Sequence, residues 1–165
     1  VIDAANIDLK SFSDDIYMRL NAGNLDTVLN TLKILKEEGV WLEITNLVVP
    51  DWTDDLSMIK EMCKWLYKNG FQNVPLHFSR FHPLYKLEHL PSTPLDKLKK
   101  ARQIGFDEGL NYVYIGNAPG TDGENTYCPN CEKMVIKRRG FFILRNDISA
   151  GRCNNCGHSI AGRWA

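Results

Sequence analysis

The sequence has no long apolar run and no excess of charge of either sign. Its uncharged apolar stretches, such as Leu47-Val48-Val49, are much shorter than the roughly 20 residues that a membrane-spanning helix needs. Twenty basic residues balance twenty acidic ones, so no net field draws the chain to nucleic acid or to an anionic membrane. We therefore expect no membrane partner, and we expect any anion site to be local.

Cysteine is scarce outside one short region. The chain has 165 residues, 44% hydrophobic and 24% charged, which is typical of one globular domain or of a domain with a small appendage. Four of its five cysteines form two Cys-x-x-Cys pairs, which indicates metal ligation in a reducing compartment and favours the cytoplasm. Because the chain begins with Val1 inside an apolar run rather than with Met, we expect it to be part of a longer polypeptide.

Three helical segments are predicted from apolar residues at helical spacing and from signals at their ends. They run from Leu25 to Gly39, from about Asp54 to Gly70, and from Thr93 to Gly105 or Gly109. In the third segment Thr93 is predicted as the N-cap, with Pro94 in the first helical position.

Four strand-like runs alternate with these helices. They are Ile2 to Leu9, Val40 to Val49, Val74 to Arg80 and Asn111 to Gly116, and their starts recur every 34 to 38 residues. This alternation predicts an α/β fold with parallel strands, namely the C-terminal half of a partial (β/α) barrel. A small open α/β sheet is the alternative. Because the first strand would leave an open sheet edge, we expect an N-terminal barrel half as its partner.

The texture of the sequence changes after Gly116. Residues 1–116 form the predicted half-barrel, the turn-rich segment 117–127 is predicted as a linker, and residues 128–165 are predicted as a zinc ribbon.

Two Cys-x-x-Cys knuckles are the strongest chemical signal. Their cysteines are Cys128, Cys131, Cys153 and Cys156. Two residues between ligands let a tight turn direct both thiolates at one ion, and two such turns complete a tetrahedral site that zinc prefers. Rubredoxin-like iron and a redox pair are the alternatives. With four thiolates the site is structural, and His158 is interpreted as a neighbour rather than a ligand.

The ribbon carries a small positive charge. From Glu124 onward there are seven Lys or Arg residues against three acidic ones, and a zinc tetrathiolate would halve this surplus. We therefore do not expect nucleic acid as a partner, and we interpret Lys137-Arg138-Arg139 as a solvated turn.

Polar residues lie where the predicted strands end, which is where barrel enzymes carry their chemistry. Asp8 and Lys10 share one side of the first strand, and form either a surface ion pair or a grip on a zwitterionic or ribose-bearing ligand. On later strands a lined cavity is predicted from Glu43, Thr45, His77, Ser79 and Arg80, with His82 beside it. Cys63 lies on an apolar helical stripe and is interpreted as core.

Four motifs in order, followed by the ribbon, carry a resemblance over essentially the whole chain. They are Asp8-Leu9-Lys10-Ser11-Phe12, Asn46-Leu47-Val48-Val49-Pro50-Asp51, His77-Phe78-Ser79-Arg80-Phe81-His82-Pro83 and Tyr114-Ile115-Gly116-Asn117-Ala118-Pro119-Gly120. The sequence resembles the C-terminal half of radical S-adenosylmethionine (SAM) enzymes similar to pyruvate formate-lyase activating enzyme. Within these it is most similar to the radical SAM component of the AmmeMemoRadiSam system.

The resemblance implies a partial (β/α)6 barrel, a 4Fe-4S cluster and reductive cleavage of SAM, followed by hydrogen abstraction from a substrate. It implies that Asp8 and Lys10 contact the methionyl and ribose parts of SAM, and that His82 lies by the nucleoside. No Cys-x-x-x-Cys-x-x-Cys cluster motif occurs in the sequence, so the enzymatic activity would belong to a longer parent. The substrate stays open between a glycyl radical protein, another peptide and a small molecule. A noncatalytic zinc-ribbon module that binds protein or nucleic acid is the alternative.

Overall fold

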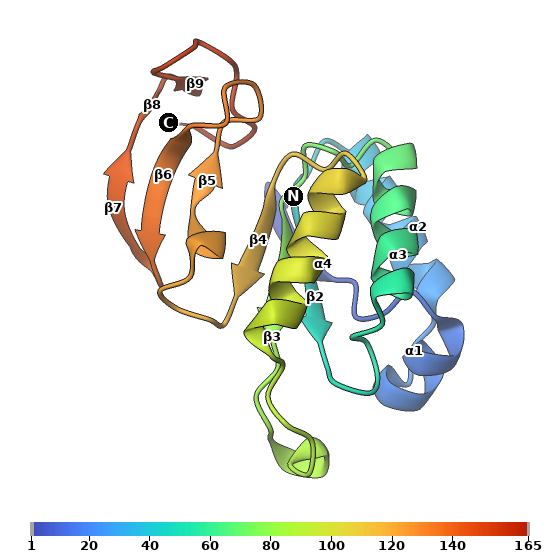
Figure 1. Ribbon diagram of the computed structural model, residues 1–165. Helices are drawn as coiled ribbons and strands as arrows, with labels where there is room; N and C mark the ends of the chain where they lie inside the picture. Colours follow the sequence, from blue (N-terminus) through green and yellow to red (C-terminus); the bar gives the residue numbers. More distant parts are fainter. Residues whose placement is uncertain (1, 165) are drawn as a thin grey trace.

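The computed structural model describes residues 2–164 and contains a helix-covered sheet and a small ribbon of antiparallel strands beside it (Figure 1). The sheet unit consists of β1 (Ala4–Asp8), α1 (Asp14–Asn21), α2 (Leu25–Glu37), β2 (Trp41–Val48), α3 (Leu56–Lys68), β3 (Leu76–Arg80), the 3-10 turn η1 (Tyr85–Leu87), α4 (Leu95–Asp107) and β4 (Val113–Gly116). The ribbon consists of η2 (Asp122–Glu124), β5 (Thr126–Tyr127), β6 (Met134–Arg139), β7 (Phe142–Asn146), β8 (Ile148–Ser149) and β9 (Arg152–Cys153).

The four strands of the sheet unit are parallel and lie in their chain order, β1-β2-β3-β4. The helices α2, α3 and α4 lie along one side of this sheet, while the ribbon lies beyond β4 (Figure 1). An open doubly wound sheet reverses its strand order and carries helices on both faces, whereas a barrel keeps its helices outside. The predicted half-barrel is therefore confirmed, and the four-stranded parallel sheet is its core element.

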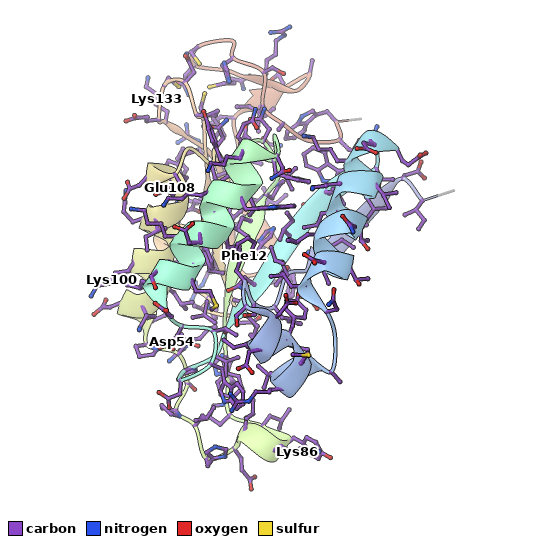
Figure 2. All side chains as sticks on the ribbon, turned by 90° about the vertical axis from the view of Figure 1, so that its right-hand side faces the viewer. Phe12, Asp54, Lys86, Lys100, Glu108 and Lys133 are labelled. Atoms are coloured by element: carbon purple, nitrogen blue, oxygen red, sulfur yellow. The ribbon has the colours of Figure 1, made fainter. Side chains whose placement is uncertain are left out.

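Alternation along β2 separates the two faces of the sheet. Leu42, Ile44 and Val48 are buried under the helices, while Glu43 and Thr45 point to the other face and stay partly exposed. The apolar face packs on helical residues that are also almost fully buried, Leu32, Ile59, Met62, Leu66 and Leu98. On the outer surface of α4, Lys100 extends into solvent (Figure 2). The hydrophobic core thus lies on the helix-covered side of the sheet. The opposite face, here called the inner face, carries polar groups such as Glu43.

The helices differ from prediction in two ways: the N-cap of α4 is a different residue, and there is one additional helix. Pro94, not Thr93, is the N-cap of α4, because the Thr93 hydroxyl is used elsewhere: it donates to the Val48 carbonyl and accepts from the Phe81 N–H. The helix α1 was not predicted at all. Its signal is nevertheless in the sequence, since Ser13 accepts from the Ile16 N–H and two aspartates follow in the first turn.

The ribbon is a three-stranded antiparallel sheet, β5-β6-β7, with the short β8-β9 pair beyond it. Its first strand, β5, lies inside the segment predicted as a linker. Its core is small and consists of Tyr112, Val135, Ile160 and two of the cysteines. No helix in residues 2–164 is both long and apolar enough to cross a membrane.

Candidate metal centre and polar face of the sheet

The four knuckle cysteines converge at the end of the ribbon. Their sulfur atoms all lie within 4.8 Å of one another, with Cys128 and Cys156 at 3.6 Å and Cys131 and Cys153 at 3.8 Å. Four sulfurs at this spacing surround one ion, as in a tetrahedral thiolate site. The structure therefore brings the predicted ligand set together, and it can hold a metal ion.

The backbone of the second knuckle favours thiolates. The His158 N–H and the Asn130 side chain donate to the Cys156 sulfur and lower the pKa of this thiol to about 6. His158 thus acts through its backbone and lies outside the four-sulfur group. Because thiolates held this closely repel one another, a cation is needed among them, and zinc fits a set of four soft sulfur donors.

The ion pair at the carboxyl end of β1 lies on a loop whose backbone is fixed by hydrogen bonds from other elements. Lys10 Nζ lies 2.7 Å from Asp8 Oδ2, and both side chains are partly exposed. The Tyr17 hydroxyl accepts from the Lys10 N–H at 2.9 Å, and burial raises the pKa of this hydroxyl. The buried Asn46 amide donates to the Leu9 and Lys10 carbonyls at 2.8 and 3.1 Å. The loop that carries Lys10 is therefore fixed, while its charged head faces outward.

His82 lies at the same edge of the sheet, beyond β3. Its Nε2 is 3.2 Å from the Asn117 carbonyl, and the Asn117 amide donates to the Arg80 carbonyl. Lys10 in turn lines a pocket of about 270 Å³ together with Leu47 and Phe81. One strand, β2, lies between β1 and β3, so the axes of these two strands are roughly 10 Å apart. Asp8, Lys10 and His82 thus share one edge without touching one another across the sheet.

A carboxylate–imidazole pair lies on the inner face of the sheet. His77 Nε2 is 3.0 Å from Glu43 Oε2, and the His77 ring stacks on Tyr114 with centroids 5.1 Å apart. The hydrogen bond from His77 lowers the pKa of Glu43, more than burial raises it. Burial raises the pKa of Tyr114. Glu43 is therefore a stable anion in the middle of the inner face.

The other predicted cavity residues do not gather with this pair. The Thr45 hydroxyl donates to the Asn6 side chain at 2.9 Å. Arg80 donates through Nε to the Thr93 carbonyl and so stabilises the loop before α4. Ser79 faces Gly116, where an added Cβ would lie only 2.7 Å from the Ser79 hydroxyl, so the two strands approach closely there.

Arg138 was interpreted as part of a solvated turn, and this is wrong. It belongs to β6, is half-buried, and donates through Nη1 to the Thr126 hydroxyl at 2.7 Å. With Phe141 it forms a wall opposite Glu43 and His77. Sequence reasoning missed this placement because the docking of the ribbon on the sheet joins residues about 95 positions apart, and the only available signal was the strand period of β6.

Among residues 2–164, no set of cysteines is arranged for a 4Fe-4S cluster. The four ribbon thiols lie within 4.8 Å of one another, a spacing that suits a single ion, and Cys63 lies apart from them in the core. Burial raises the pKa of the Cys63 thiol to about 12, which keeps it protonated and unsuited to ligation.

One curated protein is similar to this chain in sequence. No family model matches the chain. The chain is 44% identical over 161 residues to an uncharacterized protein of Methanocaldococcus jannaschii, covering 96% of this chain and 48% of that protein. The chain therefore spans about half the length of this curated relative.

Among solved structures, the chain is similar to a domain of a pyruvate-formate lyase-activating enzyme from Bacteroides vulgatus. The TM-score is 0.58 at 17% identity, over 70% of this chain and 68% of that chain. The chain shares the fold of that domain. At this identity the likeness concerns the fold alone.

Proposed function

We propose that this chain is the C-terminal portion of a radical SAM enzyme similar to pyruvate formate-lyase activating enzyme. More narrowly, we propose the radical SAM component of the AmmeMemoRadiSam system. The observation that carries the proposal is the Asp8–Lys10 ion pair, fixed at the carboxyl end of β1 in a sheet that has the fold of an activating-enzyme domain. In parallel α/β folds, ligands bind at this end of the strands.

The donor set at this edge suits SAM. Lys10 offers a cation for the carboxylate of the methionyl part, and Asp8 offers an acceptor for an ammonium or a ribose hydroxyl. His82 lies beyond the end of β3, and only β2 separates β3 from β1, so an extended nucleoside with an amino-acid tail would cross β2 to reach both groups. When bound, SAM would supply hydrogen abstraction after its reductive cleavage, and the residues of this chain would bind and orient it.

The remaining parts of the enzyme would come from a longer polypeptide. In this proposal an N-terminal barrel half pairs with the open edge of β1 and contributes the cluster ligands, in keeping with a relative about twice as long. The ribbon holds a structural zinc ion, and the reducing cytoplasm keeps its thiols free of disulfides. The substrate is a protein, a peptide or a small molecule.

Titration of SAM into the longer polypeptide tests the proposal. With its cluster loaded, it should bind SAM, and Lys10→Ala should weaken binding about tenfold, as expected for a lost charge-assisted hydrogen bond. Lys100→Ala, on the opposite surface, is the matched control and should leave the affinity unchanged. Zinc content should stay the same in both variants.

Two results would contradict the proposal. One is a longer polypeptide with no Cys-x-x-x-Cys-x-x-Cys motif and no affinity for SAM, which would favour the noncatalytic zinc-ribbon module. The other is an unchanged SAM affinity after Lys10→Ala, which would remove the role of this lysine.

A further inference from the structure

A pocket of about 590 Å³ lies between the inner face of the sheet and the hairpin that joins β6 and β7. Glu43, His77 and Tyr114 line it from the sheet, and Arg138 and Phe141 line it from the ribbon. It reaches the strand ends at Asn117, next to His82, but neither Asp8 nor Lys10 lines it. It is therefore a second place where this chain can hold a ligand.

The cation in this pocket has unused donors. The Arg138 guanidinium is anchored through Nη1, which donates to the Thr126 hydroxyl and, at 3.5 Å, to the Glu124 carbonyl. Its Nε and Nη2 donate to no described residue, and no described carboxylate forms a salt bridge with it. A half-buried, pre-oriented guanidinium with two free donor groups is suited to a carboxylate.

Two anions line the same pocket, and they differ in availability. Both oxygens of Glu124 accept backbone hydrogen bonds, from Gly120 at 2.9 Å and from Gly140 at 3.0 Å. Glu43 contacts His77 but forms no salt bridge with a lysine or arginine of the described residues. Arg138 acts on Glu43 only from a distance, and lowers its pKa less than the His77 hydrogen bond does. Glu43 and Arg138 therefore face one cavity as separated opposite charges.

The opposite charges of Arg138 and Glu43 favour a ligand that itself carries both charges. An anion alone would meet the two carboxylates, and a cation alone would meet the guanidinium, so each would gain from one wall and lose to the other. A zwitterion satisfies both walls. The rest of the lining is mostly apolar and includes Pro75, Ile115 and the exposed ring of Phe141, which suits an apolar or aromatic side chain.

We infer that this pocket binds a zwitterionic ligand of the amino-acid class with an apolar side chain. Arg138 receives its carboxylate, and Glu43 receives its ammonium group. As a statement about the substrate of the reaction, this rests on the proposed function. As a statement about binding, it stands on the pocket alone.

Three probes with the same aromatic body test the inference on the zinc-loaded chain by fluorine NMR. They are para-fluorophenylalanine (zwitterion), 3-(para-fluorophenyl)propionate (anion) and para-fluorophenethylamine (cation). The zwitterion should bind about tenfold more tightly than either singly charged probe, since each retained charge pair adds a charge-assisted hydrogen bond. Equal affinity for all three probes, or no binding of the zwitterion, would overturn the inference.

Matched variants assign the two charges. Arg138→Gln should weaken the zwitterion and the anion about tenfold and should not weaken the cation, which loses a repulsive neighbour. Glu43→Gln should weaken the zwitterion and the cation about tenfold and should not weaken the anion. Arg139→Gln is the control, because Arg139 is the next residue of β6, is exposed, and does not line the pocket. If Arg138→Gln loosens the ribbon, Phe141→Ser gives an independent reading: its side chain is fully exposed, so its loss should weaken all three probes without affecting folding. Unchanged affinities in Arg138→Gln and Phe141→Ser would contradict the inference.

The outcome is distinct from that of the SAM titration. The probes need neither SAM nor a cluster, and Lys10→Ala should not change their affinities. Binding of the zwitterion with no SAM binding by the longer polypeptide would leave the pocket standing and remove the radical SAM proposal. SAM binding by the longer polypeptide with no binding of the zwitterion would remove the inferred pocket ligand and leave the radical SAM proposal standing.

Discussion

The sheet unit and the ribbon are stabilised in different ways. The sheet unit buries a continuous core between β1–β4 and three helices, with some twenty residues almost fully removed from water. The hydrophobic cluster of the ribbon is small, with Cys128, Val135, Cys153 and Ile160 packed against Tyr112 of the sheet unit, and all five residues of β7 are exposed. About 40 residues cannot bury enough apolar surface to offset their conformational entropy, so such a segment needs a metal or disulfides. One chain thus combines a unit that its hydrophobic core stabilises with a unit that depends on ligation by its cysteines.

The largest expected effect is the loss of the metal. Cys131→Ser should reduce the metal content from about one zinc per chain and abolish the amide protection of β6 and β9, because metal-binding free energy is folding free energy in such sites. The sheet unit should stay protected. Elemental analysis and hydrogen exchange measure both effects.

Cys63→Ala is the matched control, because it removes a cysteine from the core of the sheet unit instead. It should keep the zinc and the ribbon. Full amide protection of the ribbon in metal-free Cys131→Ser would contradict this difference, since it would mean that the small ribbon core suffices for folding.

The next largest effect concerns the core. Phe78 is fully buried in β3, and Phe78→Ala should lower the free energy of unfolding of the sheet unit by about 3–5 kcal/mol. Zinc content should not change. Phe141→Ala, on the exposed hairpin, should cost less than about 0.5 kcal/mol. Urea unfolding of the wild type and the two variants measures these free energies. Equal losses of unfolding free energy in both variants would contradict the assignment of the core.

A smaller effect is expected at Thr93. Its buried hydroxyl joins the Val48 carbonyl and the Phe81 N–H, so Thr93→Val leaves both backbone groups unpaired and should cost about 2 kcal/mol. Thr27→Val is the control, because Thr27 is exposed and its hydroxyl donates only to the side chain of Asn24. Urea unfolding should separate the two variants. The same cost in both would mean that the two buried hydrogen bonds of the Thr93 hydroxyl contribute no more than the exposed one of Thr27.

The smallest effect is a pH dependence at Glu43. Because its pKa is lowered in the folded chain, the stabilisation is fully present above the unfolded value of about 4.3 and is lost as the pH falls through the lower, folded value. The side chain is 40% exposed, so solvent screening keeps the effect below about 1 kcal/mol. Hydrogen exchange of β2 in wild type and Glu43→Gln should differ above pH 5 and converge toward pH 3. A constant difference would contradict the lowered pKa.

Local patterns predicted much of this molecule. The Cys-x-x-Cys spacing predicts the four-sulfur group because each knuckle is a single turn, and the alternation of β2 predicts that Glu43 and Thr45 share the face away from the core. The helix start at Thr93 was predicted wrongly because its hydroxyl has tertiary partners, which no local pattern encodes. Arg138 was missed for the same reason: its partners come from the docking of the ribbon on the sheet.

The two-sided lining of the larger pocket links the metal to a ligand that never touches it. One wall belongs to the ribbon, and this wall exists in its folded position only while the four thiolates hold their ion. Thermodynamic linkage is reciprocal, so any ligand that needs both walls must raise the affinity for the metal by the same factor as the metal raises the affinity for the ligand. Removal of the ion should therefore empty this pocket while the sheet unit stays folded.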